Sequence, residues 1–189
     1  MALLVSKLSS DLVGAFKTPE WTVAANLYAT AINTFFITGM VTTTVTGTVT
    51  PPPPGTSFVA VGTGTGNPVT TGLPSLITSC VSAFKSPSWA TAGNIIANGI
   101  NTLVSTSTIT TTVAGALTGI GVGTIVPTGL GLLTTQLSTA FSSGQAWEQT
   151  AMNIATAVNT FIKTCTVNTT DTGSIPPVSW VGVGVGTIA

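Results

Sequence analysis

One segment of this chain occurs three times, and its spacing limits the fold more than any other feature. Residues 15–21 read Ala-Phe-Lys-Thr-Pro-Glu-Trp, residues 83–89 read Ala-Phe-Lys-Ser-Pro-Ser-Trp, and residues 140–147 hold a looser copy with one insertion. Residues 15–47 align without a gap to residues 83–115, and 17 of these 33 positions are identical. A period of about 60 residues is therefore the unit of construction. We expect three repeats, at 3–72, 73–128 and 129–189.

The first part of each repeat is predicted to be a short amphipathic helix that ends at an aromatic residue. Apolar residues recur at spacings of three and four, which places them on one helical face. These stripes are Val5, Leu8, Leu12 and Phe16; Leu73, Leu76, Cys80 and Phe84; and Leu130, Leu133, Leu137 and Phe141. Proline follows the aromatic residue in two copies, where it closes one helix and opens the next. Cys80 stands where the other copies have leucine, so we interpret it as a buried apolar residue.

A longer helix is predicted to begin at each repeated tryptophan, because apolar residues continue at helical spacing for about four turns. Near its end each copy has an Asn-Thr pair. Asparagine is unfavourable in a late helical turn, so its recurrence indicates a hydrogen bond to a neighbouring loop or to the next repeat. Nine positions are therefore taken as structural repeat positions: Phe16, Trp21, Asn33, Phe84, Trp89, Asn101, Phe141, Trp147 and Asn159.

The third part of each repeat is predicted to be extended. Residues 41–49, built mainly from Val and Thr, follow a pattern of alternating apolar and polar residues, residues 109–113 repeat this pattern, and residues 165–170 are a weaker copy. Branched, uncharged residues favour strands, and each strand is too short to be stable without a partner. A Gly-, Thr- and Pro-rich segment follows each strand and is interpreted as an extended arm or linker, including the prolines at 51–54 and 176–177.

These parts predict an α+β protein of three tandem repeats, each a two-helix hairpin followed by a Thr-rich strand and a Gly/Pro-rich extended arm. Cys80 and Cys165 fall at non-equivalent places in their repeats, so neither a disulfide nor a metal site is expected. The long segment after the first strand leaves two arrangements open. The repeats could pack on one another or be strung apart.

Charge is nearly absent from the chain, and this excludes some classes of partner. Charged residues are 4% of the sequence and the net charge is zero, against roughly 25% charged residues in an ordinary soluble domain. Near-zero charge favours association. Nucleic-acid binding is not expected, since four scattered lysines form no basic patch. The composition favours a surface that meets other protein, with a soluble domain covered by Thr, Ser and Asn as the alternative.

Membrane insertion is considered because the mean hydropathy is +0.60. Residues 113–133 are uncharged and long enough to span a bilayer. They also hold six glycines and a proline, so we interpret them as linker and strand, and a membrane role is not favoured. The N-terminus has no basic region before an apolar core, so no secretory signal is expected.

The residues needed for common enzyme chemistry are missing. The chain has no His, which excludes a serine triad in its usual form. Glu20 and Glu148 stand beside the repeated Trp, where acids favour a helix N-terminus electrostatically. The Gly-rich runs at 62–66 and 182–186 match neither the Walker pattern nor a dinucleotide fingerprint. We expect no enzymatic activity, no cofactor, no metal and no small-molecule substrate.

A helix that ends in Ala-Ile-Asn-Thr-Phe, followed by a Thr/Val strand and a Gly- or Pro-rich tail, resembles small virion proteins of tailed phages. The matching stretches here are 29–47, 97–115 and 155–173, so the resemblance covers all three repeats. It implies a structural component of the particle and carries no functional residues over. Members of that family often have a single unit, and three tandem units are a departure from it.

The leading hypothesis is therefore a virion structural protein of the head, neck or tail, assembled in the host cytoplasm. It would contact other virion proteins and copies of itself through its hairpins, and its arms would add strands to neighbouring sheets. One alternative is a secreted or cell-surface adhesive repeat protein, and another is a membrane-associated protein.

Overall fold

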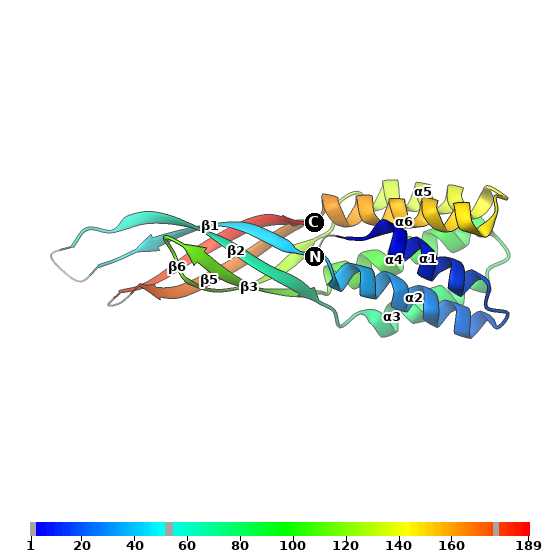
Figure 1. Cartoon of the computed structure of the whole chain (residues 1–189), viewed down its shortest axis with the longest axis horizontal. Coiled ribbons are helices and arrows are strands. Elements are labelled where there is room, and N and C mark those ends of the chain that lie inside the picture. The colour runs from blue at the N-terminus through cyan, green and yellow to red at the C-terminus, as the bar shows by residue number, and fades with distance from the viewer. Residues whose placement is uncertain (1–2, 52–54, 176–177) are drawn as a thin grey trace.

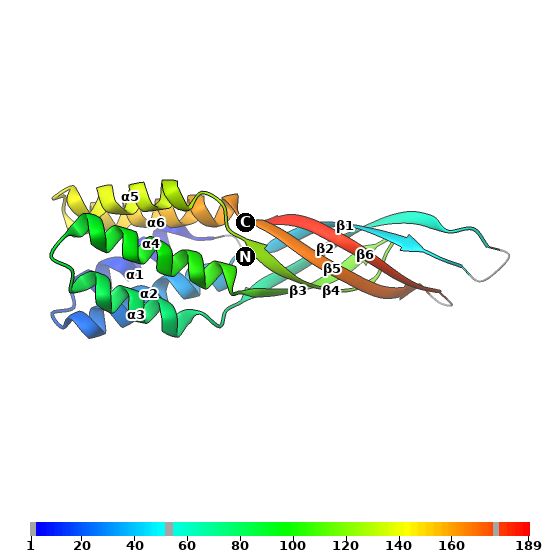
Figure 2. The same ribbon diagram turned by 180° about the vertical axis from the view of Figure 1, so that it is seen from behind.

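The computed structural model describes residues 3–51, 55–175 and 178–189. Within these residues the chain is a mixed α+β protein with six helices and six strands. The helices occupy one end of an elongated molecule and the strands occupy the other, as the two opposite views show (Figure 1, Figure 2). The prolines at 52–54 and 176–177, predicted to belong to extended arms, lie outside the described residues.

The order helix, helix, strand, strand occurs three times along the chain. The elements are α1 (Val5–Phe16), α2 (Trp21–Ile37), β1 (Val41–Val49), β2 (Phe58–Val69), α3 (Leu73–Phe84), α4 (Trp89–Ser105), β3 (Thr108–Gly115), β4 (Gly119–Val126), α5 (Leu130–Ser142), α6 (Trp147–Thr164), β5 (Thr166–Ile175) and β6 (Val178–Ile188). The predicted stretches 3–72, 73–128 and 129–189 each hold two helices and two strands. These stretches pack on one another and are not strung apart, because they share one helical core and one sheet.

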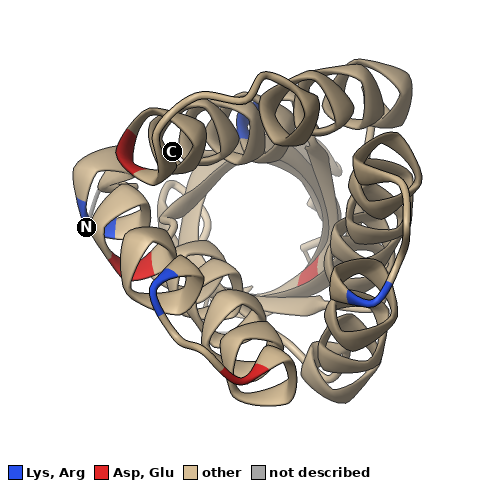
Figure 3. Ribbon diagram, turned by 90° about the vertical axis from the view of Figure 1, so that its right-hand side faces the viewer, with Lys and Arg blue, Asp and Glu red and all other residues tan. Residues whose placement is uncertain are grey.

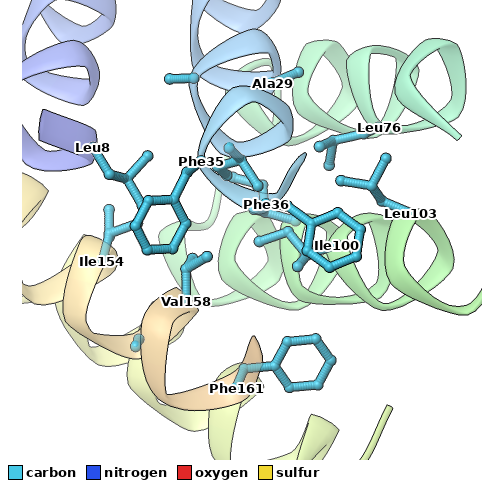
Figure 4. Packing of buried hydrophobic residues seen from close by; sticks show 14 of the residues in the cluster. Leu8, Ala29, Phe35, Phe36, Leu76, Ile100, Leu103, Ile154, Val158 and Phe161 are labelled. Carbon is cyan, nitrogen blue, oxygen red and sulfur yellow. The ribbon is translucent and has the colours of Figure 1, made fainter. Parts of the chain in front are cut away.

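The helices form a ring in which each packs on the next and α6 packs on α1 (Figure 3). The predicted stripe of the short helices is turned inward, with Leu8, Leu76 and Leu133 at 0–1% exposure. Phe35 of α2 lies among Leu8, Ile154 and Val158, while Phe36 lies toward Leu76, Ile100 and Leu103 (Figure 4). Each fully buried Leu, Ile or Phe contributes roughly 1.5–3 kcal/mol through the hydrophobic effect. This ring therefore supplies the main stabilisation of the fold.

The strands form a closed antiparallel barrel in the order β1 to β6. Each Thr-rich strand lies between two Gly-rich strands, so that Val45 of β1 faces Gly62 of β2 on one side and Gly184 of β6 on the other. The pairing of β1 with β6 closes the barrel and joins residues 41–49 to residues 180–188, which are far apart in the sequence. At the junction with the helices, the backbones of Met40 and Ala189 exchange two hydrogen bonds of 3.0 and 2.9 Å, which hold the C-terminus there.

The prediction that the Gly-rich segments are extended arms or linkers is wrong for the described residues, because they are the strands β2, β4 and β6. Their glycines face the narrow barrel interior and their valines face outward. A Cβ at Gly186 would collide with the carbonyl oxygen of Thr42, and one at Gly121 would collide with the Asp171 carboxylate. Across the middle of the barrel the interior therefore has room for side chains from the Thr-rich strands only. At its two ends the Gly-rich strands do contribute buried side chains, namely Ile125 and Ile188 near the helices and Ala60 and Trp180 at the far end.

The barrel interior contains two apolar regions with a polar layer between them. Val41, Ile109 and Val167 continue the helical core into the near end of the barrel. A second cluster fills the far end and consists of Val45, Val49, Ala60, Val113, Leu117 and Trp180. Two residues further along each Thr-rich strand is a threonine, and all three are buried: Thr43, Thr111 and Thr169. This Thr layer separates the two cores along the barrel axis.

The segment 113–133 contains the end of β3, the whole of β4 and the start of α5, so the predicted strand is present there. In the described part of the chain, none of the helices combines the length and hydropathy that crossing a bilayer requires.

Candidate functional site

The repeated aromatic residues meet at the end of the helix ring that lies away from the barrel. Each Phe is at the end of a short helix and each Trp opens the following long helix, so all six belong to three equivalent helix–helix turns. Together they line one hollow of about 310 Å³. The six are Phe16, Trp21, Phe84, Trp89, Phe141 and Trp147, and we call this set the aromatic cup. Figure 3 views the molecule from this end.

Ring contacts join different helix pairs across the cup. Phe16 lies 5.1 Å from Trp147, and Trp89 stacks on Phe141 with centroids 6.2 Å apart and planes 11° from parallel. Phe16 also meets Phe141 edge-on at 6.2 Å. Such pairs contribute about 0.5–1.5 kcal/mol beyond the burial of their area. The aromatic contacts therefore hold the three helix pairs together at this end.

Tyr28 lies beneath the cup and is fully buried. Its ring contacts Phe16 at 5.9 Å and Phe84 edge-on at 5.5 Å. Its hydroxyl has no hydrogen-bond partner among the described residues. Burial raises the pKa of Tyr28 well above its usual value, with a smaller contribution from Cys80, and burial also raises the pKa of the Cys80 thiol. Both groups stay neutral at physiological pH and act as packing residues.

Charged groups gather at the rim of the cup. Lys17 forms an ion pair of 3.0 Å with Glu148, which joins the end of α1 to the first turn of α6. This hydrogen bond from Lys17 lowers the pKa of Glu148. Glu20 caps α2 by accepting hydrogen bonds of 2.9 Å from the backbone N–H groups of Thr22 and Val23, which lower its pKa. All of these charges support helix ends and helix contacts.

The arrangement of the cup suits contact with an apolar or aromatic group. Trp21, Trp89 and Trp147 remain about half exposed, whereas the rest of their helical stripe is buried. The residues that line the hollow include neither a carboxylate nor a thiol. The cup therefore offers apolar surface and ring faces, and Lys17 is the one charged residue in its lining.

The repeated asparagines lie at the opposite end of the long helices, near the barrel. Asn33 Oδ1 accepts a hydrogen bond of 2.7 Å from the hydroxyl of Thr70, in the connection that follows β2. Asn159 is partly buried and its Oδ1 has no partner among the described residues. The structure thus brings the six aromatic positions into one site and leaves the three asparagines apart from it.

Sequence reasoning missed two features of the barrel. One is the set of outward valines and isoleucines on the Gly-rich strands, and the other is the buried Thr layer with Asp171 beside it. The strict alternation of Val and Gly at 181–186 was the available signal, since period two places all its valines on one face of a strand.

Comparison of the chain with protein families, with curated proteins and with solved structures finds no match in any of the three.

Proposed function

We propose that the chain consists of three tandem copies of one unit of two helices and two strands. We further propose that it is a non-enzymatic structural component of a tailed-phage particle, in the head, neck or tail. Its partners would be other virion proteins and copies of itself. Support comes from the low charge, the shared aromatic turns and, above all, the outer surface of the barrel.

The outer surface of the barrel carries the proposal because it has no charge and much apolar area. The one charged residue within the strands, Asp171, points inward. On β6 the side chains of Val181, Val183 and Val185 are 62%, 62% and 56% exposed. Equivalent outward residues on the other Gly-rich strands are Val59, Val61, Ile120 and Val122. Rows of exposed apolar side chains of this kind favour a site of interaction, and we infer that the barrel is enclosed by partner protein.

The mode of contact differs from strand addition. Each of the six strands already has two neighbours within the chain, so the barrel presents no edge along its paired length. The segments predicted to be free arms are strands of the barrel. The proposed partners would therefore bind through side-chain contacts over the barrel wall. Outward rows of valine and isoleucine occur on all three Gly-rich strands, which suits a place where three equivalent or similar subunits surround an axis.

Immunogold electron microscopy of purified particles, with antibody raised against this chain, tests the assignment. Label at one fixed site on the virions supports it and distinguishes head, neck and tail. Label on cell envelopes or membranes with clean virions would reject it and favour the adhesive or membrane-associated alternative.

A variant tests the contact surface itself. Changing Val181, Val183 and Val185 together to Thr keeps branched side chains on β6 and removes the apolar row. We expect reduced incorporation into particles with an unchanged circular dichroism spectrum. The matched control changes the same three residues to Ile, which keeps the row apolar and β-branched, and there we expect normal incorporation. Equal incorporation of both variants would contradict the proposed contact surface.

A further inference from the structure

Asp171 breaks the internal symmetry of the barrel at a fully buried position. Its equivalents in the first two repeats are Val45 and Val113, which belong to the far apolar cluster. The side chain of Asp171 has 0% exposure. A carboxylate placed among apolar groups carries a large desolvation penalty unless it is neutralised and hydrogen-bonded.

The side chains near Asp171 leave several oxygen atoms without partners. Asp171 Oδ2 accepts a hydrogen bond of 2.7 Å from the hydroxyl of Thr169. Asp171 Oδ1, Thr43 Oγ1 and Thr111 Oγ1 are buried and have no hydrogen-bond partner among the described residues. Buried polar atoms are rarely left unpaired in native proteins. Three such atoms in one part of the barrel therefore point to a bound species.

The facing glycines bring these oxygens together. A Cβ at Gly121 would collide with both Asp171 Oδ1 and Thr111 Oγ1, so these two atoms lie next to the same point of the barrel wall. A Cβ at Gly64 would collide with Thr43 Oγ1 and lie 3.2 Å from Thr111 Oγ1. The carboxylate and the Thr layer therefore converge on one region of the interior, bounded by the apolar core on either side.

No protein cation neutralises Asp171 in the described part of the chain. Lys7 pairs with Asp11, Lys17 pairs with Glu148, Lys85 is exposed at the end of α3, and Lys163 is exposed on α6. Asp171 is also the one carboxylate of the barrel strands. One negative charge surrounded by hydroxyl oxygens matches a cation of charge +1, whereas a divalent ion would leave an excess positive charge buried.

We propose that Asp171, together with Thr43, Thr111 and Thr169, binds a monovalent metal cation such as Na⁺ or K⁺ inside the barrel. Carboxylate and hydroxyl oxygens are the ligands that hard cations prefer. The ion would pair the three orphan oxygens and neutralise the buried charge. It would thereby connect strands β1, β3 and β5, one from each repeat. This site is independent of the proposed role in the particle.

Thermal unfolding of the full chain in NaCl, KCl and choline chloride at equal ionic strength tests the proposal. Choline is too large for the site, so it controls for general salt effects. A cation that binds the folded state alone raises the Tm as its concentration rises. We expect the wild-type Tm to be higher in NaCl or KCl than in choline chloride, with the difference growing with concentration. Equal Tm values in all three salts would overturn the proposal.

Two variants and a diffraction measurement sharpen the test. Asp171→Val restores the residue of the other two repeats, and we expect its Tm to be the same in the three salts. Asp171→Asn keeps the shape without the charge and should also lose the cation dependence, so it serves if the valine variant does not fold. A cation dependence retained by these variants would reject Asp171 as the ligand. If KCl raises the Tm, crystals grown in RbCl should show an anomalous peak beside Asp171, since Rb⁺ replaces K⁺, and its absence would then reject the site.

Discussion

The ring of Phe16 lies 5.1 Å from the ring of Trp147, and this contact joins the first helix of the chain to the last. The Lys17–Glu148 ion pair lies directly beside it. Helix α1 and helix α6 are far apart in the sequence, so these contacts close the helical ring as the β1–β6 pairing closes the barrel. The two closures complete the helical ring and the barrel.

Replacing Trp147 with Ala should destabilise the protein more than replacing Trp21 with Ala. Trp147 is 46% exposed and contacts Phe16, whereas Trp21 is 57% exposed and has no ring partner among the described residues. We expect the free energy of unfolding to fall by about 2 kcal/mol for Trp147→Ala and by about 1 kcal/mol or less for Trp21→Ala. Urea denaturation measures both, and equal losses would contradict the closing role of Trp147.

Two glycine substitutions should have opposite effects on stability. A Cβ at Gly186 would collide with the carbonyl oxygen of Thr42, so Gly186→Ala should force β6 away from β1 and cost about 1–3 kcal/mol. A Cβ at Gly14, within α1, meets nothing within 4 Å. Gly14→Ala should therefore stabilise the protein by about 0.5–1 kcal/mol through helix propensity. Thermal denaturation of both variants checks the signs, and a stable Gly186→Ala protein would argue against the tight barrel.

The Asn33–Thr70 hydrogen bond predicts a difference between equivalent asparagines. Asn33→Ala leaves the hydroxyl of Thr70 without its partner and should cost about 1–2 kcal/mol. Asn159→Ala removes an oxygen that has no partner among the described residues and should cost less. In a double-mutant cycle with Thr70→Val, Asn33→Ala should show a coupling energy and Asn159→Ala should show none. Chemical denaturation supplies the four stabilities of each cycle.

Stability should fall in acid because of two carboxylates at the cup. The pKa values of Glu20 and Glu148 are lowered in the folded protein from an ordinary value of 4.5. Their contribution is therefore present above that value and lost as pH falls through the lowered folded pKa. Tm measured between about pH 6 and pH 3 should drop, and less so for Glu20→Gln or Lys17→Met. High salt should weaken the Lys17–Glu148 part, since both side chains are exposed.

Stability should also fall in alkali through a buried thiol. Burial raises the pKa of Cys165 from 9.0 to about 11. Its neutral form is favoured by folding, so its contribution is present below the unfolded pKa and lost as pH rises from 9.0 toward about 11. Cys165→Val should flatten the Tm profile in that interval. An unchanged profile would assign the alkaline loss to Tyr28 and Cys80, whose pKa values are also raised.

Much of the helical half of the protein could be predicted from the sequence. The stripes with spacings of three and four predicted the helices and their buried faces, and the repeated Phe and Trp predicted where one helix ends and the next begins. These features depend on local periodicity, which the sequence contains directly. The strand β1 was predicted at its observed bounds, Val41–Val49, for the same reason.

The Gly-rich segments show where local pattern was insufficient. Alternating Val and Gly normally suggests an open linker, since glycine weakens a strand. Across the middle of this barrel the interior is too narrow for side chains from all six strands, so glycine occupies the inward positions of every second strand there. That requirement exists only once the barrel is closed, and closure joins β1 to β6 across the whole chain.

By itself the sequence determined the repeat, the helices, the Thr-rich strands and the near absence of charge, because each is a matter of local composition and period. The tertiary structure alone decided that the Gly-rich segments are strands, that six aromatic residues form one cup, and that Asp171 is buried beside the Thr layer. These features arise from residues that are distant in the chain, and only the closure of the ring and the barrel brings them into contact.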